Sequence, residues 1–256
     1  MKAGKAIALG AVSVFVSVQA FAATVKTFMV PSAAMAKDIP VTVMLPDGYP
    51  AQGSKRYPVV YMLHGAGDNH TTFADEVGRK GVDKYGFIGI CPDGERKSWW
   101  YDSPVNPRCK YETFVAGELV AWVDRTYRTI PEKSARAIGG LSIGALQSIH
   151  ITANHPDMFD YVGLFSPMVH PVPHPSAHCT FNRRLKEKQK TQFATSPELY
   201  WVMIGRTDFF YPRMIAYHNY LERNAYEHEY RTTRGGHQWY NWEDYSILFM
   251  QRLWGN

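Results

Sequence analysis

The sequence predicts an α/β fold in which helices cover both faces of a mostly parallel central sheet. Three observations lead to this prediction. Short apolar, strand-like runs alternate with stretches of helical spacing along the chain. The run 58–63 is continuously apolar, as expected of a central parallel strand that is covered on both faces. Residues 136–146 combine a strand, a tight turn and a helix, with Ser142 at the apex of the turn.

The first 22 residues are expected to be a cleavable secretory signal peptide. Two lysines precede an apolar run of 13 residues from Ala6 to Val18, and an A-x-A site ends at Ala22. A membrane anchor is the alternative, but 13 residues are too few to span a bilayer. We therefore expect cleavage after Ala22, a secreted or periplasmic protein without a stable membrane anchor, and one domain over residues 23–256.

Charge gives no sign of a nucleic-acid partner. The formal net charge is +5, and the predicted signal peptide contributes two of the lysines. The remaining positive charges are scattered, and the densest basic run, 183–190, is interrupted by Glu187. A run of this kind is typical of a solvated helix face.

The three cysteines leave one pairing open. Cys91 ends an apolar run and is expected to be buried in a strand. Cys109 and Cys179 lie in loop-like sequence, so they are candidates for a disulfide in an oxidising compartment, although the odd count leaves this undecided.

The N-terminal half begins with two strands that are expected to form a β-meander, the second ending at the turn sequence 46–50. A helix follows the central strand, and a longer helix is indicated by apolar residues at helical spacing after an aromatic loop at 98–104. The expected elements are strands over 24–31, 40–45, 58–63 and 87–91, and helices over 72–80 and 111–127.

The C-terminal half repeats the alternation of strand and helix. The elbow strand leads into a helix that no breaker interrupts before Pro156. Residues 168–197 show no strong pattern and are read as an insertion over the sheet edge. The remaining expected elements are strands over 161–165, 199–204 and 230–233, and helices over 212–224 and 242–253.

Ser142 is the candidate nucleophile. It lies in Gly140-Leu141-Ser142-Ile143-Gly144, which fits the G-x-S-x-G pattern of a nucleophile elbow. Glycines are expected on either side because a strand that turns directly into a helix brings two backbones close together.

A serine hydroxyl needs a base, and the base needs a carboxylate to orient it. In a parallel sheet these partners belong in loops after later strands. Asp208 follows the strand ending at Ile204, and His237 follows the last strand, so Ser142, Asp208 and His237 are the predicted catalytic triad. Taken singly, Asp208 is also a candidate helix N-cap and His237 a candidate surface residue.

The oxyanion hole requires two backbone N–H groups. One is expected from Ile143, directly after the nucleophile, and the other from Ala66, in the loop after the strand 58–63. His64 lies beside this loop and is expected mainly to orient it.

Several motifs together resemble the esterase D, or putative esterase, family of α/β-hydrolases. They are Leu63-His64-Gly65-Ala66-Gly67-Asp68-Asn69, Pro92-Asp93-Gly94, Trp100-Tyr101-Asp102-Ser103-Pro104, Tyr111-Glu112-Thr113-Phe114, Gly140-Leu141-Ser142-Ile143-Gly144, His155-Pro156-Asp157-Met158-Phe159, Gly205-Arg206-Thr207-Asp208-Phe209 and Gly235-Gly236-His237-Gln238-Trp239. The resemblance covers about residues 40–245 and implies an α/β-hydrolase fold with the same triad. One departure is Ala145, where many members have a further glycine.

Two further groups of side chains have alternative readings. His170, His174 and His178 are spaced four apart, but the prolines between them make a helical metal site implausible, so no metal or cofactor is expected. Trp99, Trp100, Tyr101, Trp239 and Trp242 flank the predicted edge, either to stack on a substrate or to pack the core. His64, Trp100, Tyr101, Gln238 and Trp239 are the candidate substrate contacts.

The resulting hypothesis is a serine carboxylic-ester hydrolase that cleaves short-chain acyl, acetyl or feruloyl-type esters, on small molecules or a polysaccharide, through an acyl-enzyme. One alternative is an acyltransferase that uses the same triad with a sugar or lipid alcohol. The alternative from another class is a non-catalytic carbohydrate-binding protein on a hydrolase scaffold. Because a general base must be neutral, we expect activity to be lost in acid.

Overall fold

The computed structural model describes residues 23–49, 51, 53–96, 98–169 and 184–255. The predicted signal peptide, the histidines at 170, 174 and 178, and Cys179 lie outside the described residues. The proposed pairing of Cys109 with Cys179 therefore stays a prediction. No helix among the described residues has the length and apolar character needed to cross a membrane.

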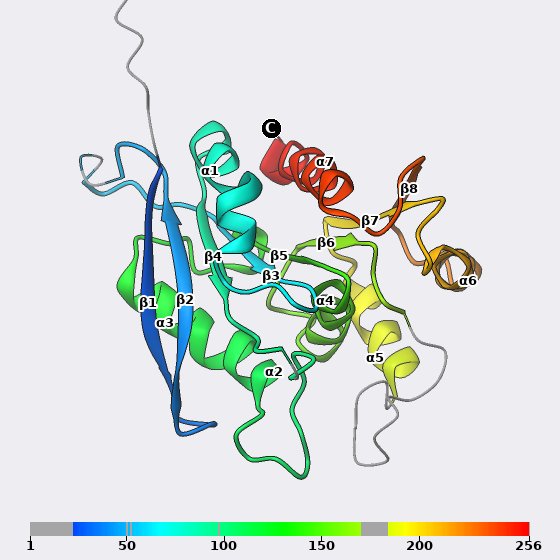
Figure 1. The fold of residues 1–256 in the computed structure, drawn as a ribbon, viewed down its shortest axis with the longest axis horizontal. Helices are drawn as coiled ribbons and strands as arrows, with labels where there is room; N and C mark the ends of the chain where they lie inside the picture. Colours follow the sequence, from blue (N-terminus) through cyan, green and yellow to red (C-terminus); the bar gives the residue numbers. More distant parts are fainter. Residues whose placement is uncertain (1–22, 50, 52, 97, 170–183, 256) are drawn as a thin grey trace, which may run out of the picture.

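One eight-stranded sheet forms the centre of the molecule, in the order β1-β2-β4-β3-β5-β6-β7-β8 (Figure 1). The first two strands form an antiparallel hairpin, and β2 also pairs antiparallel with β4. Every other pairing is parallel. The strands are β1 (Thr24–Ser32), β2 (Lys37–Leu45), β3 (Val59–Leu63), β4 (Ile88–Pro92), β5 (Arg136–Leu141), β6 (Tyr161–Phe165), β7 (Leu199–Gly205) and β8 (Glu229–Thr233).

Strand burial follows from position in the sheet. All residues of β3, β4, β5 and β7 are buried, because helices cover both faces of the parallel region. The edge strand β1 is mostly exposed or half-buried, with only Val30 and Ser32 buried, and the other edge strand, β8, is half-buried with one exposed residue. The mostly parallel α/β prediction is confirmed.

Two helical layers cover the sheet (Figure 1). One face packs against α1 and α7, and the other packs against α3, α4 and α6. The helices are α1 (Arg79–Tyr85), α2 (Tyr111–Thr113), α3 (Val120–Thr126), α4 (Ile143–Asn154), α5 (Leu185–Gln192), α6 (Tyr211–Arg223) and α7 (Trp239–Met250). Single-turn π-helical segments at Ala74–Gly78 and Phe114–Leu119 lead directly into α1 and α3.

Two helices refine the sequence prediction. The stretch 168–197, which shows no strong pattern as a whole, contains α5, which overlaps the basic run 183–190 that is expected to form a solvated helix face. The last helix, α7, begins at Trp239, three residues before the predicted start, so it follows His237 almost immediately.

Candidate active site

Ser142 lies in the tight turn between β5 and α4, with a backbone φ of 56° and ψ of −115°. A non-glycine residue at positive φ is strained, and it persists only where its surroundings fix it. Here the Ser142 N–H donates to the Phe165 carbonyl at 2.9 Å, and the Ser142 carbonyl accepts from the N–H groups of Leu146 and Met168 at 3.1 and 3.2 Å. These three bonds hold the hydroxyl at the carboxyl edge of the sheet.

Gly144 shows why the turn excludes side chains. A Cβ at this position would lie against the Leu63 carbonyl oxygen, far inside van der Waals contact, and 2.7 Å from the His64 carbonyl oxygen. The first turn of α4 thus rests directly on the backbone at the end of β3. This is the close approach that the sequence pattern predicts.

The structure brings together the three residues predicted to form a triad. Ser142 Oγ lies 3.0 Å from His237 Nε2, and His237 Nδ1 lies 2.8 Å from Asp208 Oδ2. Ser142 follows β5, Asp208 follows β7, and His237 follows β8. Residues 95 positions apart in the sequence therefore meet at one edge of the sheet.

Asp208 is an anchored carboxylate with a fully buried side chain. Burial on its own would raise the pKa of Asp208. Hydrogen bonds from the His237 imidazole and the Phe210 backbone N–H stabilise the charged form, so that the net pKa is lowered. The ionised carboxylate can only accept, so His237 Nδ1 carries the proton and Nε2 is free to accept the Ser142 hydroxyl proton.

The His237 ring is also held by aromatic neighbours. Its centroid lies 4.5 Å from that of Phe209, 5.2 Å from that of Phe210 and 4.8 Å from that of Trp242. Phe209 and Phe210 were not among the predicted site residues. Their only sequence signal was their position directly after Asp208.

A pocket of about 440 Å³ opens beside the hydroxyl of Ser142. Its lining includes Ser142, His237, both predicted oxyanion residues Ala66 and Ile143, and five large aromatic side chains. Ile143 begins α4, and the first N–H groups of a helix have no partner within it, so its N–H is suited to an anion. The aromatic lining residues are Trp99, Phe209, Phe210, Trp239 and Trp242.

Two charged side chains also line the pocket. Arg96 is exposed, whereas Asp68 is half-buried and is hydrogen-bonded by the Trp239 side chain. Burial raises the pKa of Asp68, although this hydrogen bond opposes the change. Neither residue was a sequence candidate, because an isolated charge in a loop gives no pattern.

The structure places His64 and Trp100, two of the candidate substrate contacts, beneath the loop that contains Ala66 and outside the pocket lining. His64 is 4 % exposed, and its ring accepts the Gly94 N–H at Nε2 (2.9 Å) and donates to the Gly65 carbonyl at Nδ1 (2.9 Å). Trp100 is fully buried, and its indole N–H donates to the His64 carbonyl at 3.1 Å. Both side chains therefore support the loop that contains Ala66, the orienting role also considered for His64.

Of the other candidate contacts, Trp239 lines the pocket, whereas Tyr101 and Gln238 are not part of its lining. Gln238 is exposed and directly precedes α7.

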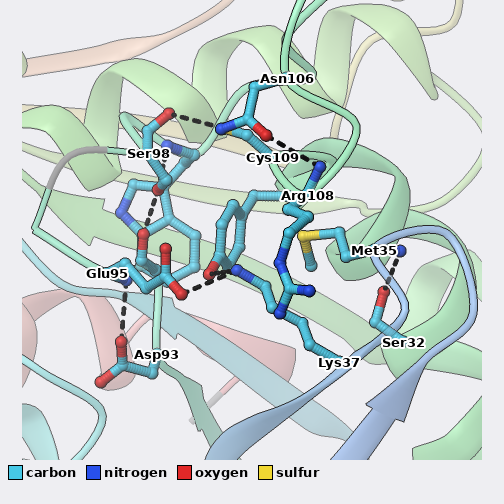
Figure 2. Close-up of polar contacts among 12 residues, drawn as sticks. Ser32, Met35, Lys37, Asp93, Glu95, Ser98, Asn106, Arg108 and Cys109 are labelled. Carbon is cyan, nitrogen blue, oxygen red and sulfur yellow. Dashed lines mark hydrogen bonds and ion pairs between the residues drawn. The ribbon is translucent and has the colours of Figure 1, made fainter.

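A polar network outside the pocket holds the loop that presents Arg96 and Trp99 (Figure 2). Lys37 Nζ lies 2.7 Å from Glu95 Oε1, and the Glu95 N–H donates to Asp93 Oδ1 at 2.8 Å. Ser98 Oγ donates to the Gly94 carbonyl in the same loop. The pocket wall is thus tied to the β1–β2 hairpin.

Comparisons with known proteins agree with this geometry. The model of the family described as "Putative esterase" matches residues 32–245. Esterase Rv1288 of Mycobacterium tuberculosis (strain ATCC 25618 / H37Rv) is 34 % identical over 121 residues, which cover 45 % of this chain and 26 % of that protein. An endo-1,4-beta-xylanase/feruloyl esterase of Xylanibacter ruminicola is 31 % identical over 137 residues, covering 48 % of this chain and 19 % of that protein.

A diacylglycerol acyltransferase/mycolyltransferase Ag85A of Mycobacterium gordonae is 29 % identical over 160 residues, covering 57 % of this chain and 44 % of that protein. The chain spans less than half the length of these curated relatives.

Two solved structures share the fold. A ferulic acid esterase superposes with a TM-score of 0.75 at 24 % identity, covering 91 % of this chain and 98 % of the other. An S-formylglutathione hydrolase from Agrobacterium tumefaciens gives a TM-score of 0.75 at 18 % identity, covering 92 % and 97 %. At these identities the likeness shows the α/β-hydrolase fold.

Gly144→Ala is expected to destabilise the protein by at least about 2 kcal/mol, because its methyl group cannot fit against the backbone of β3. Urea unfolding of both proteins measures this loss. Gly117→Ala is the matched control, since nothing lies within 4 Å of a Cβ at this position. It is expected to stabilise the protein slightly, by less than about 1 kcal/mol. Equal effects of the two variants would contradict the close packing at the elbow.

His64 is expected to make stability depend on pH. Burial is the main cause that lowers the pKa of His64, so the unfolded chain binds a proton that the folded chain resists. Stability is then complete above the unfolded pKa of about 6.5 and is lost as the pH falls below it. The difference in unfolding free energy between wild type and His64→Asn should therefore shrink from pH 7.5 to pH 5. A constant difference would show that His64 is not the titrating group.

Proposed function

The chain belongs to the putative esterase family of α/β-hydrolases, and from this premise we propose that it is a serine carboxylic-ester hydrolase that works through Ser142, His237 and Asp208. The hydrogen-bonded chain from Asp208 Oδ2 through His237 to Ser142 Oγ is the observation that supports the proposal most strongly. A serine, a histidine and an aspartate that follow three different strands and lie at these distances are typical of a catalytic triad.

The proposed reaction has two halves. Ser142 Oγ attacks the ester carbonyl carbon while His237 Nε2 takes the hydroxyl proton, and the N–H groups of Ala66 and Ile143 stabilise the negative oxygen. His237 then gives its proton to the leaving alcohol as the carbon–oxygen bond breaks, which leaves an acyl-enzyme on Ser142. Water, deprotonated by His237 Nε2, then attacks this ester, and His237 returns the proton to Ser142 Oγ as the acyl–oxygen bond breaks and the acid leaves.

The pocket favours a flat or aromatic acyl group over acetyl alone. A volume of about 440 Å³ lies within the range of small-molecule sites. Aromatic walls such as Trp99 and Trp239 offer ring faces and edges on which a hydroxycinnamoyl group can stack. Several structural neighbours and one of the relatives are themselves named as ferulic acid or feruloyl esterases. The charged side chains of Asp68 and Arg96 offer hydrogen bonds to phenolic or sugar hydroxyls of the substrate.

We also propose that this activity lies outside the cytoplasm, and the N-terminal sequence supports that location. Lysines, a 13-residue apolar run and the A-x-A site form the three parts of an export signal. A secreted or periplasmic esterase meets plant or cell-wall esters directly.

Acyl transfer is the second candidate, and it is favoured by the relative named as a mycolyltransferase. Both reactions share the acyl-enzyme and differ in whether water or an alcohol attacks it. Product analysis with and without sugar or glycerol acceptors separates them. Transfer that exceeds hydrolysis at millimolar acceptor would replace the hydrolase proposal.

Ser142→Ala is expected to abolish both hydrolysis of an ester panel (acetyl, butyryl, feruloyl, acetylated xylan) and labelling by a fluorophosphonate. Feruloyl esters should be cleaved with the highest kcat/KM. Ser196→Ala, at an exposed serine that is not part of the pocket lining, should retain both. A folded wild type that neither labels nor cleaves any ester would favour the carbohydrate-binding alternative.

Asp208→Asn is expected to lower kcat by roughly three to four orders of magnitude, because an amide can no longer fix the productive tautomer of His237. KM should change little, since the Asp208 side chain does not reach the pocket surface. Steady-state kinetics on the preferred ester, with circular dichroism as the folding control, measures the effect. A loss below tenfold would remove Asp208 from the triad.

A further inference from the structure

Two histidines and a glutamate converge away from the pocket, between α6 and β8. His218 Nδ1 lies 2.8 Å from His228 Nε2, and Glu222 Oε1 lies 3.7 Å from the same His228 nitrogen. One ligand atom from each of the three residues lies within 4.8 Å of the others. None of them lines the proposed active-site pocket.

The fold creates this cluster from two segments. His218 and Glu222 are four residues apart on α6, so they share one face of the helix. The chain then turns, with the Ala225 N–H bonded to the Glu222 carbonyl at 3.0 Å, and places His228 directly before β8. In Figure 1, α6 and β8 both lie at the end of the sheet that β8 forms.

His228 is oriented as a metal-binding histidine would be. Its side chain is only 2 % exposed, and Nδ1 donates to the Tyr226 carbonyl at 2.7 Å. This bond fixes the proton on Nδ1 and leaves the lone pair of Nε2 facing His218 and Glu222. A backbone carbonyl that holds the far nitrogen in this way is the usual outer contact of histidine ligands.

His218 is restrained as well. Its ring stacks on Tyr230 of β8, with centroids 4.2 Å apart and an interplanar angle of 18°. Glu222, in contrast, is 63 % exposed and free to approach an ion from the solvent side.

We propose that His218, Glu222 and His228 bind a divalent zinc-class cation through two imidazole nitrogens and one carboxylate oxygen, with water as the fourth ligand. Zn²⁺ prefers this donor set and tetrahedral geometry, with Zn–N distances of about 2.0–2.1 Å. Two such nitrogens lie about 3.3 Å apart around a tetrahedral ion. The present 2.8 Å is the length of a His–His hydrogen bond, so binding replaces that proton and widens the pair by about half an ångström.

The position of the proposed metal site between α6 and β8 indicates that a bound ion would stabilise the structure. Asp208 precedes the first turn of α6, whereas His218 and Glu222 lie in its later turns. His228 precedes β8, and His237 follows that strand. An ion there would join the two elements that position the acid and the base of the triad, at a distance from the substrate. The inference concerns binding and stability, so it does not rest on the proposed function.

The test uses the full mature chain after chelation and dialysis. Isothermal titration with ZnCl₂ should show one equivalent bound at this site, and Tm should rise by about 5–10 °C when free zinc exceeds Kd a hundredfold. His218→Ala should abolish the binding and the shift, and Glu222→Gln should weaken the affinity at least tenfold. Because His218 and Glu222 are not fully buried, these variants avoid the folding risk of replacing His228.

Two controls make the result specific. His155→Ala removes a half-exposed histidine that pairs with Glu112 elsewhere on the surface and should leave binding intact. His174→Ala tests the histidine-rich stretch outside the described residues and should also leave binding at this site intact. The proposal is overturned if zinc neither binds nor raises Tm, because the cluster is then only a His–His hydrogen bond. It is equally overturned if zinc binding survives His218→Ala.

Discussion

The close contact between the first turn of α4 and the end of β3 sets the geometry of the whole site. Gly144 meets the carbonyl oxygens of Leu63 and His64, so the chain has no room to turn gradually after β5. Ser142 is forced into a positive-φ conformation as a result. The same contact places the start of α4 beside the loop after β3, and this is why Ala66 and Ile143 border one pocket. The positions of the proposed nucleophile and of the proposed oxyanion donors thus follow from one close backbone contact.

The rest of the site depends on parallel strands ending at one edge. Asp208 and His237 come from neighbouring strands β7 and β8, so their register places the carboxylate against the imidazole. Aromatic rings then fix the imidazole from several sides, with Phe209 and Phe210 following Asp208 and Trp242 lying in α7. The proposed metal site belongs to the same region, because α6 and β8 are the elements it would join.

Much of the fold and of the candidate site could be predicted from the sequence, and particular residues show why. The proximity of Ser142, Asp208 and His237 could be predicted because glycines and strand ends mark each of them, and the mostly parallel sheet followed from the apolar runs. The burial of Trp100 could not be predicted, because a sequence cannot distinguish an aromatic that packs beneath a loop from one that faces a substrate. Helix α5 was expected only as a solvated face within 183–190, because the sequence LKEKQKTQ has no apolar stripe from which its bounds could be predicted. The pairing of His218 with His228 arises across a turn, where no periodic spacing connects them.

The position of β8 at the edge of the sheet has a consequence for dynamics. This strand pairs with β7 alone, and none of its residues is fully buried. Edge elements with few buried contacts open locally at a lower free energy than the core does. The base His237 is attached to this strand, whereas Ser142 lies deep between β5 and α4. Partial opening at this edge would therefore separate base from nucleophile while the remaining sheet stays folded, so catalytic competence and global stability are set by different parts of the same domain.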